Sequence, residues 1–277
     1  MTNVKIQMTK PTVQDILQRK GKSKLVMLTC YDYSFAGLLD SSGVDIILVG
    51  DSLANVVLGL KETRNVSFSE MLNHTRAVVK GAPNSLVIAD MPFVSYQKNP
   101  LKCLDYAKKF MAAGAGGVKI EWFPYVSGRG CPYVVKKLIK NGIPVMGHIG
   151  LTPQTAHLLG GFKVQGRTPD SARALLAQAK LLEGLGVFSL VLECIPVKLA
   201  GKITAGLTIP TISCGAGPYC DGQVLVLYDM LGLYDKIRPR FVRRYGRLDN
   251  TVKSAVKRFI RDVRGRHYPS LKESFTA

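Results

Sequence analysis

One complete structural unit lies in the stretch Pro144-Val145-Met146-Gly147-His148-Ile149-Gly150-Leu151-Thr152-Pro153-Gln154. The short apolar run from Pro144 to Gly147 suits a strand that is buried on both faces. The run ends at the ionisable His148, and Thr152 then stands before a proline, which is the pattern of a helix N-cap and first turn. The stretch therefore predicts a buried strand whose carboxyl end carries a polar side chain and leads into a helix.

The same unit recurs along the chain. Ser67 and Glu70 have the S-x-x-E spacing of a capping box, and glycines that can end a helix in the left-handed conformation stand shortly before six of the strands. A repeated strand, helix and glycine indicates βα units with right-handed crossovers. The predicted strands are Leu25–Thr29, Ile46–Val49, Leu86–Ala89, Gly117–Ile120, Pro144–Gly147, Ser189–Leu192, Thr211–Cys214 and Val224–Tyr228. The other capping residues before proline are Asn99 and Thr168, and the glycines are Gly43, Gly81, Gly114, Gly142, Gly186 and Gly206.

Eight parallel strands close most economically into a barrel, and 277 residues are the size of one such domain. We therefore predict an α/β fold, a single-domain (β/α)8 TIM barrel over residues 1–277. A short N-terminal extension precedes it, and a basic helical tail from Lys253 onward packs outside the barrel. A doubly wound open sheet is the alternative.

The strongly positive charge of the chain limits the kinds of partner that it can have. The formal net charge is +19, and twelve Lys and Arg fall between Lys236 and Arg266. Such a charge suits either a nucleic-acid partner or a solvated basic surface, and no aromatic stacking motif or nucleic-acid module accompanies it. We therefore expect no nucleic-acid partner.

The cysteines and the apolar runs indicate the compartment. The six cysteines form no C-x-x-C pair, so neither a zinc site nor a disulfide framework is expected. Residues 1–24 lack the apolar core of a secretory signal, and no apolar run is long enough to cross a bilayer. We expect a reduced, cytoplasmic protein without a membrane partner.

Five consecutive predicted strands finish in an ionisable residue. In a parallel barrel the carboxyl ends of the strands meet at one rim, where catalytic groups lie. A polar residue can also end a strand because the chain is reaching water, but five in a row favour a functional site. The five residues are Asp51, Asp90, Glu121, His148 and Glu193.

Three of these residues predict a metal site. Asp51, Asp90 and Glu121 offer hard oxygen ligands, which suit Mg²⁺, and converging carboxylates repel one another unless a cation lies between them. Lys119 lies two residues before Glu121 and so points to the same side of the strand. We expect its ammonium to balance the carboxylates, to hold an anionic substrate, or both; a purely structural ion pair is the alternative.

The remaining two residues suit proton transfer or support. Glu193 is the carboxylate best placed to stay free of the metal, so it is the candidate general base. His148 is a possible second-shell residue that orients its neighbours, with a direct role in proton transfer as the alternative.

Several long motifs resemble the ketopantoate hydroxymethyltransferase (3-methyl-2-oxobutanoate hydroxymethyltransferase) family. The resemblance runs in order from about Thr12 to Phe275, and the motif from Pro144 to Gln154 is highly specific. The other motifs are Val49-Gly50-Asp51-Ser52, Ala89-Asp90-Met91-Pro92-Phe93, Lys163-Val164-Gln165-Gly166-Arg167-Thr168, Leu192-Glu193-Cys194-Ile195-Pro196 and Asp221-Gly222-Gln223-Val224-Leu225.

The resemblance implies a function. It implies a transferase of pantothenate biosynthesis that moves a hydroxymethyl group from 5,10-methylenetetrahydrofolate, the co-substrate, to 3-methyl-2-oxobutanoate, giving ketopantoate through a Mg²⁺-stabilised enolate. It also implies a (β/α)8 barrel and a homo-oligomer, a decamer in bacterial members.

The resemblance also implies roles for single residues. By motif, Asp51, Asp90 and Glu121 match the metal ligands, and Glu193 matches the catalytic proton acceptor. The residues that match the keto-acid contacts are Asp51, Ser52, Asp90 and Lys119.

The chain departs from the family pattern at two places near the predicted site. Trp122-Phe123-Pro124-Tyr125 replaces a glycine-rich sequence, and Ser213-Cys214 replaces a pair that contains glycine.

Three competing functions stay open at this point. The first is cleavage of a C–C bond in a 2-hydroxy or 2-oxo acid, as in isocitrate lyase, which needs the same metal but no folate. The second is a non-catalytic binding protein on the same barrel. The third is nucleic-acid binding by the basic tail.

Overall fold

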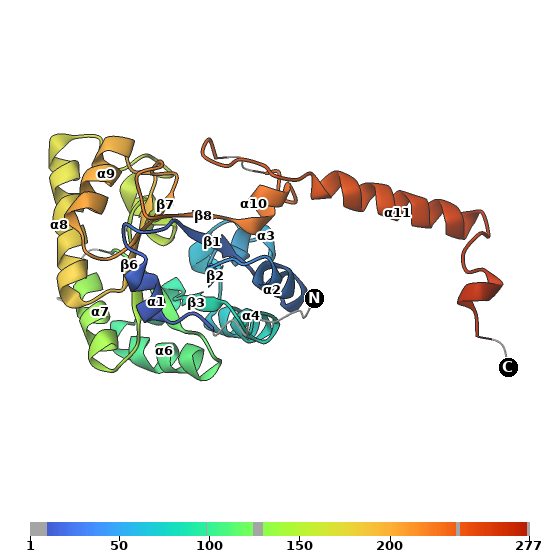
Figure 1. Ribbon diagram of the computed structural model, residues 1–277, viewed down its shortest axis with the longest axis horizontal. Helices are drawn as coiled ribbons and strands as arrows, with labels where there is room; N and C mark the ends of the chain where they lie inside the picture. Colours follow the sequence, from blue (N-terminus) through green and yellow to red (C-terminus); the bar gives the residue numbers. More distant parts are fainter. Residues whose placement is uncertain (1–9, 98, 124–129, 237–238, 276–277) are drawn as a thin grey trace, which may run out of the picture. The chain divides into compact units, whose positions relative to one another are not determined.

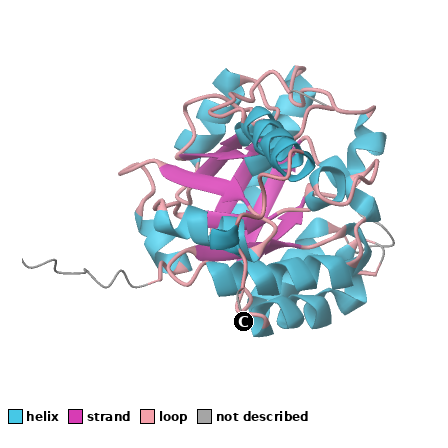
Figure 2. Cartoon of the chain, turned by 90° about the vertical axis from the view of Figure 1, so that its right-hand side faces the viewer, coloured by secondary structure: helices cyan, strands magenta, loops and turns pink. Residues whose placement is uncertain are grey.

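A closed barrel of eight parallel strands forms the centre of the first part of the chain. The computed structural model describes residues 10–97, 99–123, 130–236 and 239–275, which divide by their internal contacts into two units, Met1–Val226 and Leu227–Ala277. In the first unit, β1 to β8 pair in chain order and β8 pairs with β1 (Figures 1 and 2). The predicted barrel is therefore confirmed, and the open doubly wound sheet is wrong. The N-terminal extension before residue 10 lies outside the described residues.

The strands agree with the predicted runs at their starts more often than at their ends. Three of them match to the residue, whereas β3, β4, β5 and β6 continue through polar residues because these still pair with the neighbouring strand. The strands are β1 (Leu25–Thr29), β2 (Ile46–Val49), β3 (Leu86–Asp90), β4 (Gly117–Glu121), β5 (Val145–Gly150), β6 (Ser189–Glu193), β7 (Thr211–Cys214) and β8 (Gly222–Leu225).

The prediction for the eighth strand is wrong by two residues at its start. β8 begins at Gly222, and Leu227 and Tyr228 belong to a helix instead. A side chain at Gly222 would place its Cβ 2.7 Å from the carbonyl oxygen of Leu25. The barrel therefore closes at a glycine because only the missing Cβ lets the two backbones approach, a requirement that an apolar pattern does not show.

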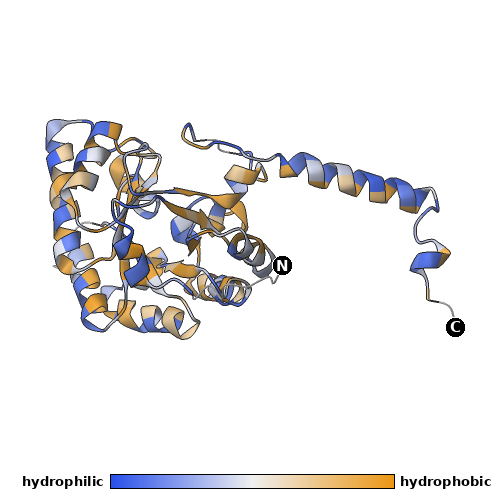
Figure 3. Ribbon diagram, in the orientation of Figure 1, coloured by the Kyte–Doolittle hydropathy of each residue, from blue (hydrophilic) through white to orange (hydrophobic). Residues whose placement is uncertain are grey.

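Helices separate the strands and cover the outside of the barrel (Figure 2). In the first unit they are α1 (Val13–Gln18), α2 (Tyr33–Ser41), α3 (Leu53–Val56), η1 (Thr63–Asn65), α4 (Phe68–Gly81), α5 (Phe93–Tyr96), η2 (Pro100–Lys102), α6 (Cys103–Ala112), α7 (Cys131–Lys140), η3 (Pro153–Leu159), α8 (Pro169–Leu185) and α9 (Val197–Gly206). Figure 3 shows mainly hydrophobic residues on the strands and a mixture of hydrophobic and hydrophilic residues on the surrounding helices. The strand residues are largely buried, so the core lies inside the helical layer.

The predicted caps are confirmed at two of four sites. Ser67 and Glu70 form the capping box of α4, and Thr168 caps α8 before Pro169. Asn99 and Thr152 are wrong as caps, because they precede the 3-10 segments η2 and η3 and make no capping side-chain hydrogen bond.

Four of the six expected helix-ending glycines are left-handed, namely Gly43, Gly114, Gly142 and Gly186. Gly81 and Gly206 are instead the last residues of α4 and α9. At Gly81 a Cβ would meet the carbonyl oxygen of Tyr33 at 2.4 Å, so this glycine allows α4 to approach α2.

A buried carboxylate fastens the amino-terminal end of the barrel. Asp221 accepts hydrogen bonds from Lys20 Nζ at 2.8 Å, Gly21 N at 3.1 Å and Thr211 N at 2.8 Å. Nearby, Ile16 of α1 is buried against inward-facing side chains of the strands. Burial opposes ionisation of Asp221, but the donors from Lys20, Thr211 and Gly21 outweigh it and lower its pKa below the ordinary value.

The second unit contains α10 (Leu227–Leu231), α11 (Leu248–Arg264) and η4 (Leu271–Glu273). The helical tail exists as expected, and its packing on the outside of the barrel stays a prediction. Hydrophilic and hydrophobic residues alternate along α11 (Figure 3). No helix in the described ranges is both long and apolar enough to cross a membrane.

We predict that Asp221→Asn lowers the free energy of unfolding by about 1–3 kcal/mol, the cost of leaving buried donors poorly paired. Urea denaturation measures this loss. A carboxylate with a lowered folded pKa contributes its stability above the unfolded pKa of about 3.9 and loses it as the pH falls through the folded value. The difference between wild type and variant should therefore be constant near neutrality and narrow in acid. A difference that widens in acid would contradict this, and the exposed Asp170→Asn is the control.

Candidate active site

The polar strand ends come together at the carboxyl end of the barrel. Asp90, Glu121 and Glu193 are the last residues of β3, β4 and β6, Asp51 follows β2 by two positions, and His148 lies in β5. All are buried except Glu193, whose side chain is 15% exposed. The register places Asp90 beside Lys119 and Glu121 beside His148 on neighbouring strands. One parallel barrel thus collects residues that are far apart in the sequence.

Lys119 and Asp90 form a buried ion pair. Lys119 Nζ lies 2.8 Å from Asp90 Oδ1, although the angles do not meet hydrogen-bond geometry. Burial raises the pKa of Asp90 to about 7, against the opposing effect of the Lys119 charge. Burial disfavours the Lys119 charge, but Asp90, Glu121 and Asp51 outweigh it and raise its pKa above the ordinary value. The lysine is therefore a cation of this cluster, and whether it also holds a substrate stays a prediction.

His148 stands between the two glutamates. Its Nδ1 lies 3.5 Å from Glu121 Oε1 and 3.4 Å from Lys119 Nζ, and its Nε2 lies 3.2 Å from Glu193 Oε2. Burial and the Lys119 charge disfavour its protonation, but the carboxylates of Glu121 and Glu193 outweigh them and raise its pKa to about 9. His148 thus links the carboxylate cluster to Glu193, a position that suits an orienting residue.

Gln154 is the residue that the strand-end pattern missed. Its Nε2 donates to Asp51 Oδ2 at 2.9 Å, and its backbone N–H donates to Glu121 Oε2 at 3.0 Å. Gln154 ends the motif that begins at Pro144. It was missed because the strand-end pattern selects ionisable residues, and the glutamine amide is neutral. Gln154 is the second residue of η3, and its contacts with Asp51 and Glu121 place it at the barrel mouth.

Ser52 lies at the rim, beside Asp51. Its hydroxyl is 2.8 Å from Tyr31 Oη, which is itself 2.7 Å from Thr29 Oγ1. Asp51 N donates to Asp90 Oδ2 at 3.2 Å, so the Asp51-Ser52 turn is connected to β3. All the predicted site residues therefore belong to one continuous region at the barrel mouth.

The cluster has the charge and donor atoms that suit a divalent cation. Four carboxylates face two basic groups, so full ionisation leaves two negative charges unbalanced. Within the cluster, Asp90 Oδ1 and Glu121 Oε1 have no hydrogen-bond partner among the described residues. Burial raises the pKa of Glu121, because it disfavours the ionised carboxylate. Hard oxygen donors of this kind fit Mg²⁺.

The side chains are nevertheless not arranged as a finished ligand set. Among the residues described, no three His, Cys, Asp or Glu side chains are grouped closely enough to hold a metal ion. Lys119 and Gln154 contact the carboxylates instead. The residue types fit the metal, although their side chains do not converge on one point in this arrangement.

The two departures from the family pattern lie close to this site. Ser213 Oγ accepts from Ala216 N at 3.0 Å and so supports the turn after β7. Cys214 is in register with Glu193, and burial followed by the Glu193 charge raises the pKa of its thiol well above the ordinary value. On the other side, Phe123 is buried against Tyr96, with ring centroids 5.3 Å apart; Pro124 and Tyr125 lie outside the described residues.

We predict that Lys119→Met, measured by urea denaturation in a chelator, lowers the free energy of unfolding by about 3–5 kcal/mol, because Asp90 loses its buried partner. The double variant Lys119→Met/Asp90→Asn should recover part of this loss, because it removes both charges. Strictly additive effects of the two substitutions would show that the pair is not coupled.

Comparisons with known proteins identify the family of the chain. The family model of ketopantoate hydroxymethyltransferase matches residues 10–271. Proteins named 3-methyl-2-oxobutanoate hydroxymethyltransferase are 48% identical in Syntrophus aciditrophicus (94% of this chain, 93% of the relative) and 49% identical in Bdellovibrio bacteriovorus (96% and 99%).

Solved structures support the fold. A phosphoenolpyruvate phosphomutase from Streptomyces platensis has a TM-score of 0.63 at 12% identity, covering 96% of this chain and 92% of its own. A 2,3-dimethylmalate lyase of the PEP mutase/isocitrate lyase superfamily has a TM-score of 0.59 at 15% identity, with 95% and 91% covered. These likenesses concern the barrel alone, whereas the sequence matches over nearly the whole chain decide the family: the chain belongs to the ketopantoate hydroxymethyltransferases.

Proposed function

We propose that this chain transfers a hydroxymethyl group from 5,10-methylenetetrahydrofolate to 3-methyl-2-oxobutanoate, giving ketopantoate for pantothenate biosynthesis in the cytoplasm. The observation that carries the proposal is the set of polar residues at one barrel end, in a chain that matches this family over residues 10–271. Asp51, Asp90, Glu121 and Glu193 are all present.

In this proposal the three buried carboxylates of Asp51, Asp90 and Glu121 hold Mg²⁺. Bound there, Mg²⁺ polarises the keto group of the substrate and so acidifies the C–H bond on the neighbouring carbon. The support lies in the oxygen donors, the unbalanced negative charge and the two carboxylate oxygens without a hydrogen bond.

The substrate carboxylate is held by charge and hydrogen bonds. The buried Lys119 ammonium is the cation of the cluster, and Ser52 offers a hydroxyl at the rim. An ammonium can contact Asp90 and a substrate anion together, because it carries three donors. A buried cation next to the reacting groups also stabilises negative charge that develops on the substrate.

Glu193 removes the proton from C3 of the keto acid. It is the most exposed carboxylate of the cluster. It lies on β6, and the strands β4 and β5 separate it from Asp51 and Asp90, which follow β2 and end β3. His148 stands between it and Glu121 and holds the base in place. Water adds to the methylene carbon of the folate and both C–N bonds break, which releases tetrahydrofolate and formaldehyde. The carbon that lost its proton then attacks the formaldehyde carbon, and the formaldehyde oxygen takes up a proton to become the hydroxyl group of ketopantoate.

We predict that Glu193→Gln slows deuterium exchange at C3 of 3-methyl-2-oxobutanoate by about 10²- to 10⁴-fold, the usual contribution of a positioned base. Exchange is followed by NMR without folate, so that only proton removal is measured. Glu183→Gln, which alters a carboxylate at the end of α8, is the matched control and should exchange at the wild-type rate. Wild-type exchange in Glu193→Gln would remove Glu193 as the base.

The reaction itself is tested by turnover of both substrates with and without Mg²⁺. We expect ketopantoate only when keto acid, folate and Mg²⁺ are all present, and a chelator should stop both turnover and exchange. Full activity in the chelator would contradict the metal assignment. Cleavage of a 2-hydroxy or 2-oxo acid without folate would favour the isocitrate-lyase type of reaction instead.

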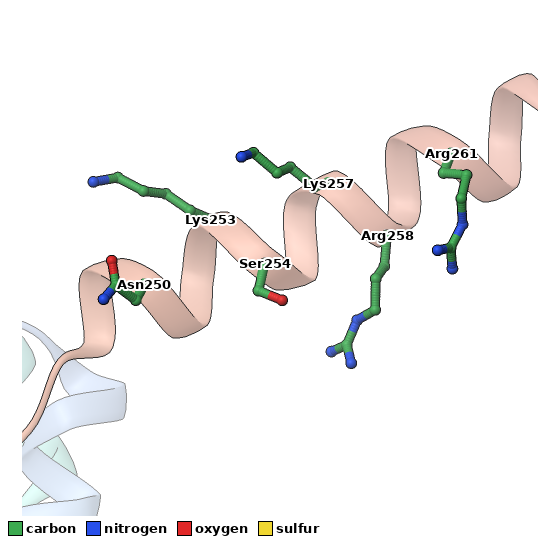
Figure 4. Close-up of a pocket in the computed structure, with 6 residues that line it drawn as sticks. All are labelled: Asn250, Lys253, Ser254, Lys257, Arg258 and Arg261. Atoms are coloured by element: carbon green, nitrogen blue, oxygen red, sulfur yellow. The ribbon is translucent and has the colours of Figure 1, made fainter.

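We also propose that the chain works as a homo-oligomer, with a decamer as the form implied by the family, and that α11 takes part in its interface. One side of α11 carries exposed apolar residues, which in a soluble enzyme mark a contact surface. The opposite side is basic, and Figure 4 shows Lys253 and Lys257 on one edge and Arg258 and Arg261 on the other. The apolar residues are Val252, Val256, Phe259, Ile260 and Val263.

We predict that Val256→Asp yields a smaller assembly in sedimentation velocity, because a charge in the apolar stripe cannot be buried without a partner. Lys257→Asp adds the same side chain to the basic face and is the control, expected to keep the wild-type assembly. An unchanged sedimentation coefficient in Val256→Asp, or dissociation in Lys257→Asp alone, would show that the apolar face is not the contact.

A further inference from the structure

Gln154 uses its polar groups on three neighbouring strand ends at once. Its backbone N–H donates to Glu121 Oε2 at the end of β4, and its Nε2 donates to Asp51 Oδ2 beyond β2. The same Nε2 donates to the backbone carbonyl of Met91, the residue after β3, at 3.1 Å. The side chain is fully buried, so water does not compete for these contacts.

The orientation of the Gln154 amide is determined by its neighbours. The Asp51 carboxylate and the Met91 carbonyl can only accept hydrogen bonds, so the NH₂ group must face them. Its Oε1 then faces Tyr96 Oη at 2.8 Å and Gln97 Nε2 at 3.3 Å, both of which donate to it. Gln97 Nε2 also donates to Tyr96 Oη at 3.0 Å, which leaves the tyrosine proton for Gln154.

These contacts engage one oxygen of each carboxylate, Asp51 Oδ2 and Glu121 Oε2. Glu121 gives Oε2 to Gln154, while its Oε1 has no hydrogen-bond partner in the described part of the chain. A neutral amide can fix a carboxylate in this way without cancelling its charge, whereas a lysine at this place would compete with a metal ion. The amide thus orients the two carboxylates without bringing a charge of its own to the site.

We propose that Gln154 is a positioning residue for the metal site: it sets the directions of Asp51 and Glu121, and the Tyr96–Gln97 pair sets the direction of Gln154. The inference rests on the proposed function, because it treats Asp51 and Glu121 as metal ligands. It adds a layer of partners behind the carboxylates that neither the strand-end pattern nor the residue roles of the family supplied.

The test is the affinity for Mg²⁺ itself, measured by isothermal titration calorimetry on the full chain without substrate. We expect Gln154→Leu to weaken Mg²⁺ binding about 10- to 100-fold, as loss of an outer partner of a metal ligand typically does. Tyr96→Phe removes only the group that orients the amide and should weaken binding less, by about 2- to 10-fold, the effect of one hydrogen bond.

Thr204→Val is the matched control for the loss of a buried hydrogen bond. Thr204 Oγ1 contacts Thr211 Oγ1 at 2.7 Å, at the start of β7 and so at the opposite end of the barrel. This variant should lose some thermal stability and keep wild-type Mg²⁺ affinity. At raised Mg²⁺ the turnover of Gln154→Leu should recover, whereas a merely structural defect would not respond to the metal.

The outcomes separate the two proposals. If the wild-type chain binds no Mg²⁺, the proposed function fails. If the wild type binds Mg²⁺ and folded Gln154→Leu binds it equally well, the positioning role is wrong. Should Gln154→Leu not fold, Tyr96→Phe decides: wild-type affinity in that variant overturns the proposal, and the smaller loss supports it.

Discussion

Buried negative charge at the mouth of the barrel is the constraint on which the rest of the site depends. Carboxylates that leave water for a protein interior need a partner, a proton or a metal. Lys119 compensates Asp90 directly, and His148 lies between Glu121 and Glu193. Each compensating group comes from a strand or turn next to the carboxylate that it serves. The register of β3 to β6 therefore fixes the electrostatics of the site as well as the fold.

The two ends of the barrel shift the pKa of a carboxylate in opposite directions. At the amino-terminal end, Asp221 is surrounded by donors from Lys20, Gly21 and Thr211, and its pKa is lowered. At the other end, Asp90 shares its single cation with other acids, and burial raises its pKa to about 7. The first arrangement is saturated and serves stability. The arrangement around Asp90 has fewer positive than negative groups. It can therefore bind a cation, and an anionic substrate can bind to that cation.

The sequence could predict the charged residues of the site. Asp90, Glu121 and Glu193 follow apolar runs, so a strand pattern alone placed them at one rim. Gln154 could not be found in this way, because it is uncharged and its importance comes from its contacts with Asp51 and Glu121. β8 was misplaced for a related reason: Gly222 is needed for backbone approach to Leu25, while the more apolar residues that follow belong to α10. Contacts between segments, rather than local patterns, decide both cases.

Cys214 shows how a departure from the family pattern can be compatible with the chemistry. Its register places it beside Glu193, where a strong donor would stabilise the carboxylate and weaken it as a base. A thiol is a weak donor, so it forms only a weak hydrogen bond of this kind. Burial and the Glu193 charge raise the thiol pKa, which keeps Cys214 protonated and unreactive as a nucleophile. Cys214 is therefore compatible with the role as proton acceptor that we propose for Glu193.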